Sequence, residues 1–89
     1  MAARVEIYTR DFCSYCTRAK NLLAGKGAAY TEIRAGDDPD KRREMIQRSH
    51  GTTYPQIFIN GRHVGGSDDI HDLDRAGRLD ALLAEPAAA

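Results

Sequence analysis

Residues 5–16 of the chain read VEIYTRDFCSYC, and this stretch decides the fold. Apolar and polar residues alternate over Val5–Tyr8, as in a half-buried strand, and apolar residues at helical spacing run from Cys16 to Leu23. Cys13 and Cys16, the chain's only two cysteines, therefore lie where a strand ends and a helix begins. Because only two residues separate them, both sulfurs are expected on one helical turn.

This position favours a reactive thiol over a structural one. Cys13 is expected at the helix N-terminus, where unpaired backbone N–H groups and the positive end of the helix dipole favour a thiolate. The thiolate is the reacting species in cysteine chemistry. Cys16, one turn further in, experiences less of this field and is the natural second thiol. A strand, a turn and a CxxC pair are typical of thiol–disulfide redox sites.

Two other interpretations of the CxxC pair are less favoured. A structural zinc site usually has four ligands, and the remaining candidates, His50, His63 and His71, form no H-x3–5-H pair. A chance pair of buried small hydrophobic residues would not be expected directly after a strand. We assign none of the three histidines a catalytic role.

Length and composition limit the possible classes of protein. The 89 residues allow one domain with a modest core, expected over residues 1–85, with residues 86–89 as a frayed tail. Basic and acidic residues balance at 13 each, so no nucleic-acid partner is expected. The apolar runs fall far short of the roughly 20 residues that span a bilayer, so no membrane partner is expected either. Met1–Arg4 leaves no room for a signal-peptide apolar region, and a reducing, cytoplasmic location follows as an expectation.

Two further elements are predicted in the middle of the chain. Ala29–Ile33 reads as a second strand, parallel to the first because a helix connects the two. Asp38 is placed as the N-cap of a second helix, with Pro39 at its first position. Gly51 is predicted to end that helix.

The last part of the chain begins with a hairpin signal. Residues 56–59 and 62–64 are strand-like and flank Asn60-Gly61, which suits a two-residue turn with positive φ at both positions. Ser67 is predicted to cap a third helix, and a fourth short helix follows. The order β-α-β-α-β-β-α-α predicts an α/β domain, a four-stranded mixed sheet flanked by helices.

With these motifs in register, the chain resembles a glutaredoxin over nearly its whole length. Thr9–Cys16 resembles the family's basic residue followed by CPYC, with serine where proline is usual. Thr53-Tyr54-Pro55 resembles Thr-Val-Pro, and Gly65–Asp69 resembles the Gly-Gly-x-x-Asp turn. The resemblance implies a thioredoxin-like fold with a cis peptide bond before Pro55.

The resemblance also implies glutathione as co-substrate and a set of residues that contact it. One or two basic side chains are expected to bind its glycyl carboxylate, backbone N–H groups its γ-glutamyl carboxylate, an aspartate its ammonium, and the backbone beside the cis-proline its peptide groups. These residues are Arg10, Tyr15, Arg42, Thr53, Tyr54, Pro55, Gly66, Ser67, Asp68 and Asp69.

The implied activity is glutathione-dependent thiol–disulfide exchange. Cys13 is expected to be the nucleophile and Cys16 the resolving thiol, with disulfide-containing or glutathionylated proteins as partners and a monomer as the working form. The alternative is a [2Fe–2S] cluster carrier, in which Cys13 and glutathione of two subunits ligate the cluster in a dimer. Ser14 raises this alternative, because serine at this position occurs in some cluster-binding relatives. No other metal site is expected.

Overall fold

The computed structural model describes residues 2–87. Its elements follow the predicted order β-α-β-α-β-β-α-α: β1 Val5–Thr9, α1 Ser14–Gly25, β2 Tyr30–Arg34, α2 Pro39–Ser49, β3 Gln56–Ile59, β4 Arg62–Gly65, α3 Ser67–Arg75 and α4 Leu79–Ala84. None of these helices is long and apolar enough to cross a membrane.

The four strands form one mixed sheet in the order β2-β1-β3-β4. β1 pairs parallel to β2, which requires the crossover connection that α1 supplies. β1 pairs antiparallel to β3, and β3 pairs antiparallel to β4. The predicted four-stranded mixed sheet is therefore confirmed, and its two central strands end close to the cysteines and to Pro55.

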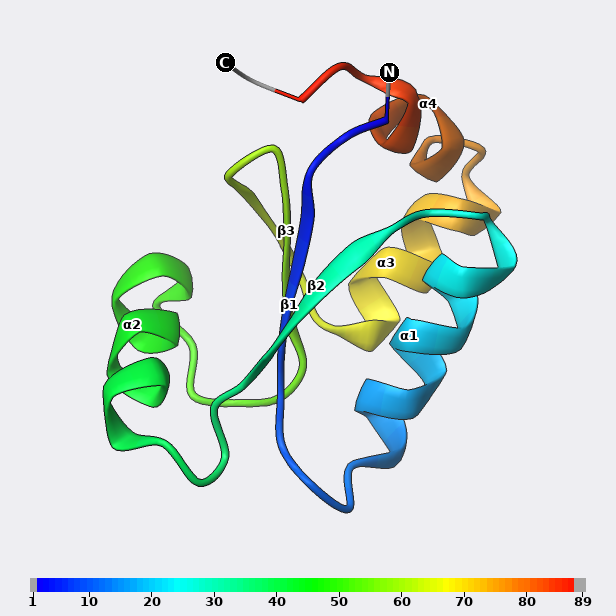
Figure 1. Ribbon diagram of the computed structural model, residues 1–89. Coiled ribbons are helices and arrows are strands. Elements are labelled where there is room, and N and C mark those ends of the chain that lie inside the picture. The colour runs from blue at the N-terminus through cyan, green and yellow to red at the C-terminus, as the bar shows by residue number, and fades with distance from the viewer. Residues whose placement is uncertain (1, 88–89) are drawn as a thin grey trace.

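Helices cover both faces of the sheet (Figure 1), with α1 and α3 on one side and α2 on the other. Because side chains alternate along a strand, Ile7 faces the α1 and α3 side while Tyr8 faces α2. Ile7 belongs to a core with Leu23 and Ile70, and Tyr8 belongs to a second core with Met45. The two central strands, β1 and β3, are thus buried on both faces of the sheet.

The second helix begins as predicted and ends differently. The Asp38 carboxylate accepts hydrogen bonds from the N–H groups of Asp40 and Lys41, and Pro39 is the first helical residue. The prediction that Gly51 ends the helix is wrong, because the left-handed residue is His50, with φ 58°. The Ser49 hydroxyl explains the difference: it donates to the Met45 carbonyl and accepts from the Gly51 N–H, which closes the helix one residue earlier.

The hairpin turn has the predicted geometry, with φ 52° at Asn60 and 78° at Gly61. Asn60 also joins the two ends of the chain. Its Oδ1 accepts from the Arg4 N–H at 2.9 Å, and its Nδ2 donates to the Pro86 carbonyl at 3.0 Å. Pro86 and Ala87 belong to the predicted tail, whereas residues 88–89 of that tail lie outside the described residues.

A polar cluster joins α2 to the sheet. The Arg48 guanidinium lies 4.0 Å from the centre of the Phe58 ring, pairs with both Glu6 carboxylate oxygens, and donates to the Tyr8 hydroxyl at 2.8 Å. The Tyr8 hydroxyl donates in turn to Glu44 at 2.6 Å. The hydrogen bonds to Glu6 raise the pKa of Arg48, and burial raises the pKa of Tyr8. Arg48 therefore stays charged while packed against an aromatic ring.

Candidate active site

Cys13 is the N-cap residue of α1, as the sequence predicts. Its φ and ψ of −117° and 104° are extended, and its sulfur accepts a hydrogen bond from the Cys16 N–H at 3.2 Å. Only 7% of the residue is exposed. A thiolate at this position receives the orphan N–H groups of the first turn, the environment that stabilises a negative charge.

Cys16 lies one turn into the helix and is 2% exposed. The pKa of Cys16 is raised from 9.0 to about 11. Burial is the largest cause, and the hydrogen bond with the Cys13 sulfur is the second. Both cysteines are free thiols in the structure. The two sulfurs are therefore unequal, with Cys16 held as the protonated thiol at neutral pH.

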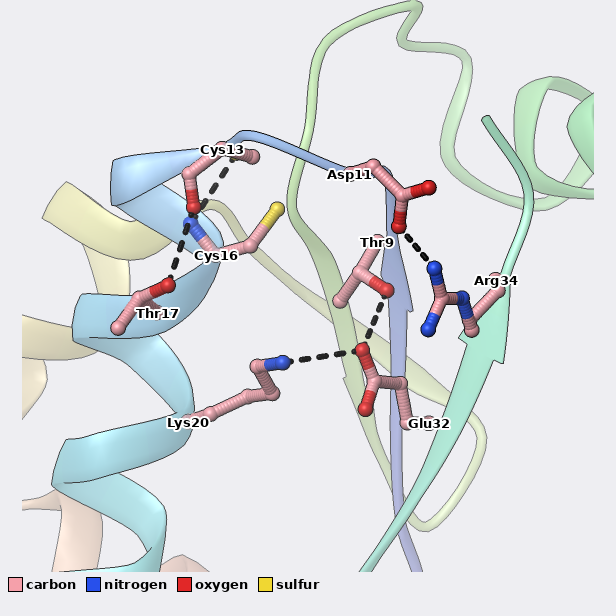
Figure 2. A network of polar contacts seen from close by, with 8 residues as sticks. All are labelled: Thr9, Asp11, Cys13, Cys16, Thr17, Lys20, Glu32 and Arg34. Carbon is pink, nitrogen blue, oxygen red and sulfur yellow. Dashed lines mark hydrogen bonds and ion pairs between the residues drawn. The ribbon is translucent and has the colours of Figure 1, made fainter. Parts of the chain in front are cut away.

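A network of polar contacts fixes the cysteine helix against the sheet (Figure 2). The Thr9 hydroxyl on β1 donates to a Glu32 carboxylate oxygen at 2.7 Å, and Lys20 on α1 pairs with the same oxygen at 3.1 Å. The Thr9 hydrogen bond and then Lys20 lower the pKa of Glu32. Because the ionised Glu32 joins α1 to β2, it sets the position of the cysteines relative to the strand ends. The Cys16 sulfur points from α1 toward β1.

An open groove of about 750 Å³ is lined in part by Tyr54, whose carbonyl oxygen lies 4.0 Å from the Cys13 sulfur. Nine of the ten residues predicted to contact glutathione line it, and Arg42 is the exception. The lining consists of Arg10, Tyr15, Thr52, Thr53, Tyr54, Pro55, Gln56, His63, Gly65, Gly66, Ser67, Asp68 and Asp69. The α1 N-terminus, the loop before β3 and the α3 N-terminus thus meet at one surface.

The loop before β3 brings a backbone carbonyl close to the Cys13 sulfur. The peptide bond between Tyr54 and Pro55 is cis, as the resemblance implies. The Tyr54 carbonyl oxygen lies 4.0 Å from the Cys13 sulfur. Tyr54 packs its ring into the core on the α2 side, so its backbone rather than its side chain is presented beside Cys13. An extended peptide can pair with such a backbone segment as with a strand edge.

The N-terminus of α3 forms the far end of the groove. The prediction that Ser67 caps this helix is wrong: Gly66 is the N-cap, and the Asp69 carboxylate accepts from the Gly66 N–H at 2.9 Å. The capping carboxylate also occupies the space beside Gly65, which has φ 123° and where any Cβ would overlap Asp69. The Ser67 hydroxyl is buried and has no hydrogen-bond partner within the described residues. The N-terminal N–H groups of this helix suit a carboxylate.

The remaining predicted contacts are Arg10, Tyr15 and Arg42, and they differ in their positions. Arg10 lies against the cysteine loop, where its guanidinium donates to the Asp11 carbonyl at 3.0 Å and the Phe12 carbonyl at 3.3 Å. Tyr15 is exposed on the first turn of α1 and lines the groove. Arg42 is exposed on α2, outside the groove lining. The structure therefore brings Arg10 and Tyr15 together with Cys13.

The groove lining includes four residues that were not predicted as site residues, Thr52, Gln56, His63 and Gly65, and Phe12 was not predicted either. Phe12, directly before Cys13, is fully exposed and has φ 55°. Gln56 and His63 line the groove and are hydrogen-bonded to each other. A signal for Gln56 exists in the sequence, because it is the one polar residue of the otherwise apolar strand segment 56–59, and a buried polar group needs a partner.

Comparison with known proteins agrees with this geometry. The family model described as Glutaredoxin matches residues 5–64. The chain is 53% identical to Glutaredoxin 3 of Escherichia coli over 81 residues, covering 91% of this chain and 98% of that protein. The crystal structure of a buckwheat glutaredoxin–glutathione complex is 32% identical, with a TM-score of 0.85 over 98% of this chain and 83% of that one. A solved structure described as "Metal Binding of Glutaredoxins" is 55% identical, with a TM-score of 0.70 over 92% and 89% of the two chains.

The similarity includes the parts that form the site. The matched residues 5–64 contain both cysteines and the cis-proline loop, and the similarity to the buckwheat structure extends over nearly the whole chain. The expected thioredoxin-like fold is confirmed. The chain belongs to the glutaredoxin family of thiol oxidoreductases.

Proposed function

We propose that this protein is a glutathione-dependent thiol–disulfide oxidoreductase in which Cys13 is the nucleophile and Cys16 the resolving thiol. The observation that carries the proposal is the geometry at Cys13. Its sulfur caps α1 by accepting the Cys16 N–H at 3.2 Å and lies 4.0 Å from the Tyr54 carbonyl, beside a peptide-sized groove. A stabilised thiolate next to a site for an extended peptide is what this reaction needs.

The groove has groups complementary to glutathione, a tripeptide with two carboxylates and one ammonium. The Ser67 and Asp68 N–H groups at the start of α3 suit the γ-glutamyl carboxylate. Arg10, at the other end of the groove, suits the glycyl carboxylate. Asp69 uses one carboxylate oxygen as the helix cap, and its second oxygen can accept from the ammonium. The similar buckwheat structure is a complex with glutathione, which supports this assignment.

The first step breaks one disulfide and forms another. The Cys13 thiolate attacks the glutathione sulfur of a glutathionylated protein, the sulfur–sulfur bond breaks, and the protein thiolate leaves and takes a proton from water. A second glutathione thiolate then attacks the glutathione sulfur of the mixed disulfide. Oxidised glutathione leaves, and the Cys13 thiolate is restored.

Cys16 provides a second route when the substrate is a protein disulfide. Cys13 attacks one sulfur of the substrate disulfide, and the other substrate sulfur leaves as a thiolate and takes a proton. Cys16 then loses its proton to water and attacks the Cys13 sulfur. The Cys13–Cys16 disulfide forms, the substrate sulfur that was bonded to Cys13 leaves as a thiolate, and glutathione later reduces the Cys13–Cys16 pair. The high pKa of Cys16 keeps it protonated until this step, so it does not compete with Cys13 for substrate.

The test is the reduction of a glutathionylated peptide, with glutathione as the reductant. The wild-type protein and Cys16→Ser are expected to turn over, and Cys13→Ser is expected to be inactive. Turnover by Cys13→Ser at the wild-type rate would refute the assignment of the nucleophile. Turnover with dithiothreitol but none with glutathione would refute the dependence on glutathione.

A second candidate function is a [2Fe–2S] carrier. It is favoured by Ser14 in the CxxC pair and by the 55% identical structure described as "Metal Binding of Glutaredoxins". Within residues 2–87 no group of three or more histidine, cysteine or acidic side chains could hold a metal. By the family resemblance, Cys13 would be the ligand from this chain, and the others would come from glutathione and a second copy. Anaerobic reconstitution with glutathione, followed by visible absorption and gel filtration, tests this candidate, and a colourless monomer would refute it.

A further inference from the structure

A chain of hydrogen bonds runs from β4 through β3 into the loop before Pro55. His63 Nε2 lies 2.7 Å from Gln56 Oε1. Gln56 Nε2 donates to the Thr53 carbonyl at 3.0 Å and to the Thr53 hydroxyl at 3.2 Å. Gln56 is only 5% exposed, and the amide uses both its oxygen and its nitrogen in these contacts. All three side chains line the groove beside Cys13.

The chemistry of the three residues fixes which atom donates and which accepts in each of these hydrogen bonds. A carbonyl oxygen can only accept, so the Gln56 amide must turn its NH2 group toward Thr53 and its oxygen toward His63. Since that oxygen also can only accept, the proton in the His63 contact lies on Nε2. The Thr53 hydroxyl, which accepts from Gln56, keeps its own proton for a partner in the groove.

We propose that Gln56 and His63 are positioning residues for the binding of glutathione. They hold the loop that carries Thr53 and Tyr54, and they orient the Thr53 hydroxyl so that it donates to a carboxylate oxygen of the bound tripeptide. The inference rests on the proposed function, because it names residues that act at the same groove.

The surroundings confine the Gln56 amide, while the exposed His63 ring has an aromatic neighbour. A Cβ at Gly51 would lie 2.9 Å from Gln56 Nε2, so the amide is confined from that side. The His63 ring packs against Phe58 with 5.1 Å between ring centres. His63 thus has two contacts, a donated hydrogen bond and an aromatic one, and two substitutions separate them. His63→Phe keeps a ring without a donor, and His63→Gln keeps a donor without a ring.

The experiment measures KM for glutathione and kcat for both variants with a glutathionylated peptide, together with the rate of Cys13 alkylation. His63→Phe is expected to raise KM roughly three- to tenfold, as for the loss of one neutral hydrogen bond, with kcat and alkylation unchanged. His63→Gln is expected to stay within about twofold of the wild type because it restores the donor. The reverse order, or equal values for the two variants, would show that His63 acts only by packing and would overturn the proposal.

Two further measurements test the donor and acceptor assignments in these hydrogen bonds. The imidazole nitrogen NMR signals of His63 at pH 9 are expected to be those of the Nε2–H tautomer, and an Nδ1–H tautomer would overturn the proposal. Gln56→Glu keeps the acceptor for His63 and removes the donor to Thr53, so it is expected to raise KM more than His63→Phe does. If the wild type shows no glutathione-dependent turnover, the proposed function and this inference fail together. If the wild type turns over and the His63 variants do not differ, this inference alone fails.

Discussion

The unequal environments of the two thiols lead to a difference in reactivity that can be measured. In Cys13→Ser the remaining thiol is Cys16, whose pKa is raised from 9.0 to about 11, with burial as the largest cause. Burial persists in this variant, so most of the shift is expected to remain. Each pKa unit changes the thiolate fraction tenfold, so two units reduce that fraction about a hundredfold at neutral pH.

The assay is alkylation of Cys13→Ser by iodoacetamide between pH 7 and 11, followed by intact mass measurement. The same chain unfolded in urea serves as the reference for an exposed thiol. The folded rate at pH 7 is expected to be about a hundredth of the unfolded rate, with the difference closing as the pH approaches 11. Equal rates at pH 7, or a folded rate that levels off near pH 9, would refute the argument from burial.

The raised pKa of Cys16 also predicts that the folded protein loses stability at alkaline pH. Below pH 9 the Cys16 thiol is protonated in both the folded and the unfolded chain, so it does not contribute to the pH dependence of the free energy of unfolding. Between pH 9 and 11 the unfolded chain releases this proton and the folded chain keeps it, so the free energy of unfolding falls as the pH rises. The full contribution is on the order of 2–3 kcal/mol. Urea unfolding of the wild type and of Cys16→Ala at pH 8 and pH 11 checks it, since the Tyr8 titration is common to both proteins.

Three further predictions concern single side chains. Cys16→Ser is expected to keep glutathione-dependent deglutathionylation and to lose the reduction of protein disulfides; full activity on both substrates would remove the resolving role. Asp69→Ala is expected to raise KM for glutathione about tenfold and to lower the free energy of unfolding by about 1 kcal/mol, because a charge-assisted contact and the cap of α3 are lost together. Asp68→Ala, its exposed neighbour, is the control, and equal effects of the two substitutions would point to general electrostatics. Arg48→Met is expected to cost about 2–4 kcal/mol in urea unfolding because Glu6 loses its partner, and part of this is expected to return in the double variant with Glu6→Gln; a loss below about 0.5 kcal/mol would contradict this reasoning.

The parts of the fold that depend on local patterns were predictable from the sequence. The alternation over Val5–Tyr8 gave the first strand, Asp38 and Pro39 gave the start of α2, and Asn60-Gly61 gave the hairpin turn. The cis bond before Pro55 was expected only through the family resemblance, because most bonds preceding proline in folded proteins are trans.

The errors at helix ends have a common physical cause. Several neighbouring residues can satisfy the same end of a helix, and the choice depends on contacts made elsewhere. His50 takes the left-handed position because the Ser49 hydroxyl bonds back to Met45. Gly66 becomes the N-cap of α3 because the Asp69 carboxylate reaches its N–H. In each case a side chain away from the predicted cap residue decides the boundary.

The role of Gln56 and His63 depends on how the strands pair. Phe58 pairs with His63, but Ile57 pairs with Gly65, so β4 contains one extra residue at that point. His63 lies directly before this irregularity, and its side chain reaches the Gln56 amide. A hairpin signal in the sequence predicts the turn and leaves such a bulge undetermined, and the sequence alone assigned His63 no catalytic role.

Cys13 is the N-cap of α1, so under the proposed mechanism its oxidation and the stability of this helix are thermodynamically linked. When a Cys13 thiolate bonds to another sulfur, the negative charge is lost, and the Cys16 N–H, which donates to the Cys13 sulfur, loses a charged acceptor. A helix cap contributes about 0.5–2 kcal/mol, which for a two-electron couple corresponds to roughly 10–40 mV. Since the cap stabilises the reduced form, it shifts the potential toward a more oxidising value. The free energy that the cap contributes at the first turn of α1 is therefore lost when the protein is oxidised. It is regained when glutathione restores the thiolate.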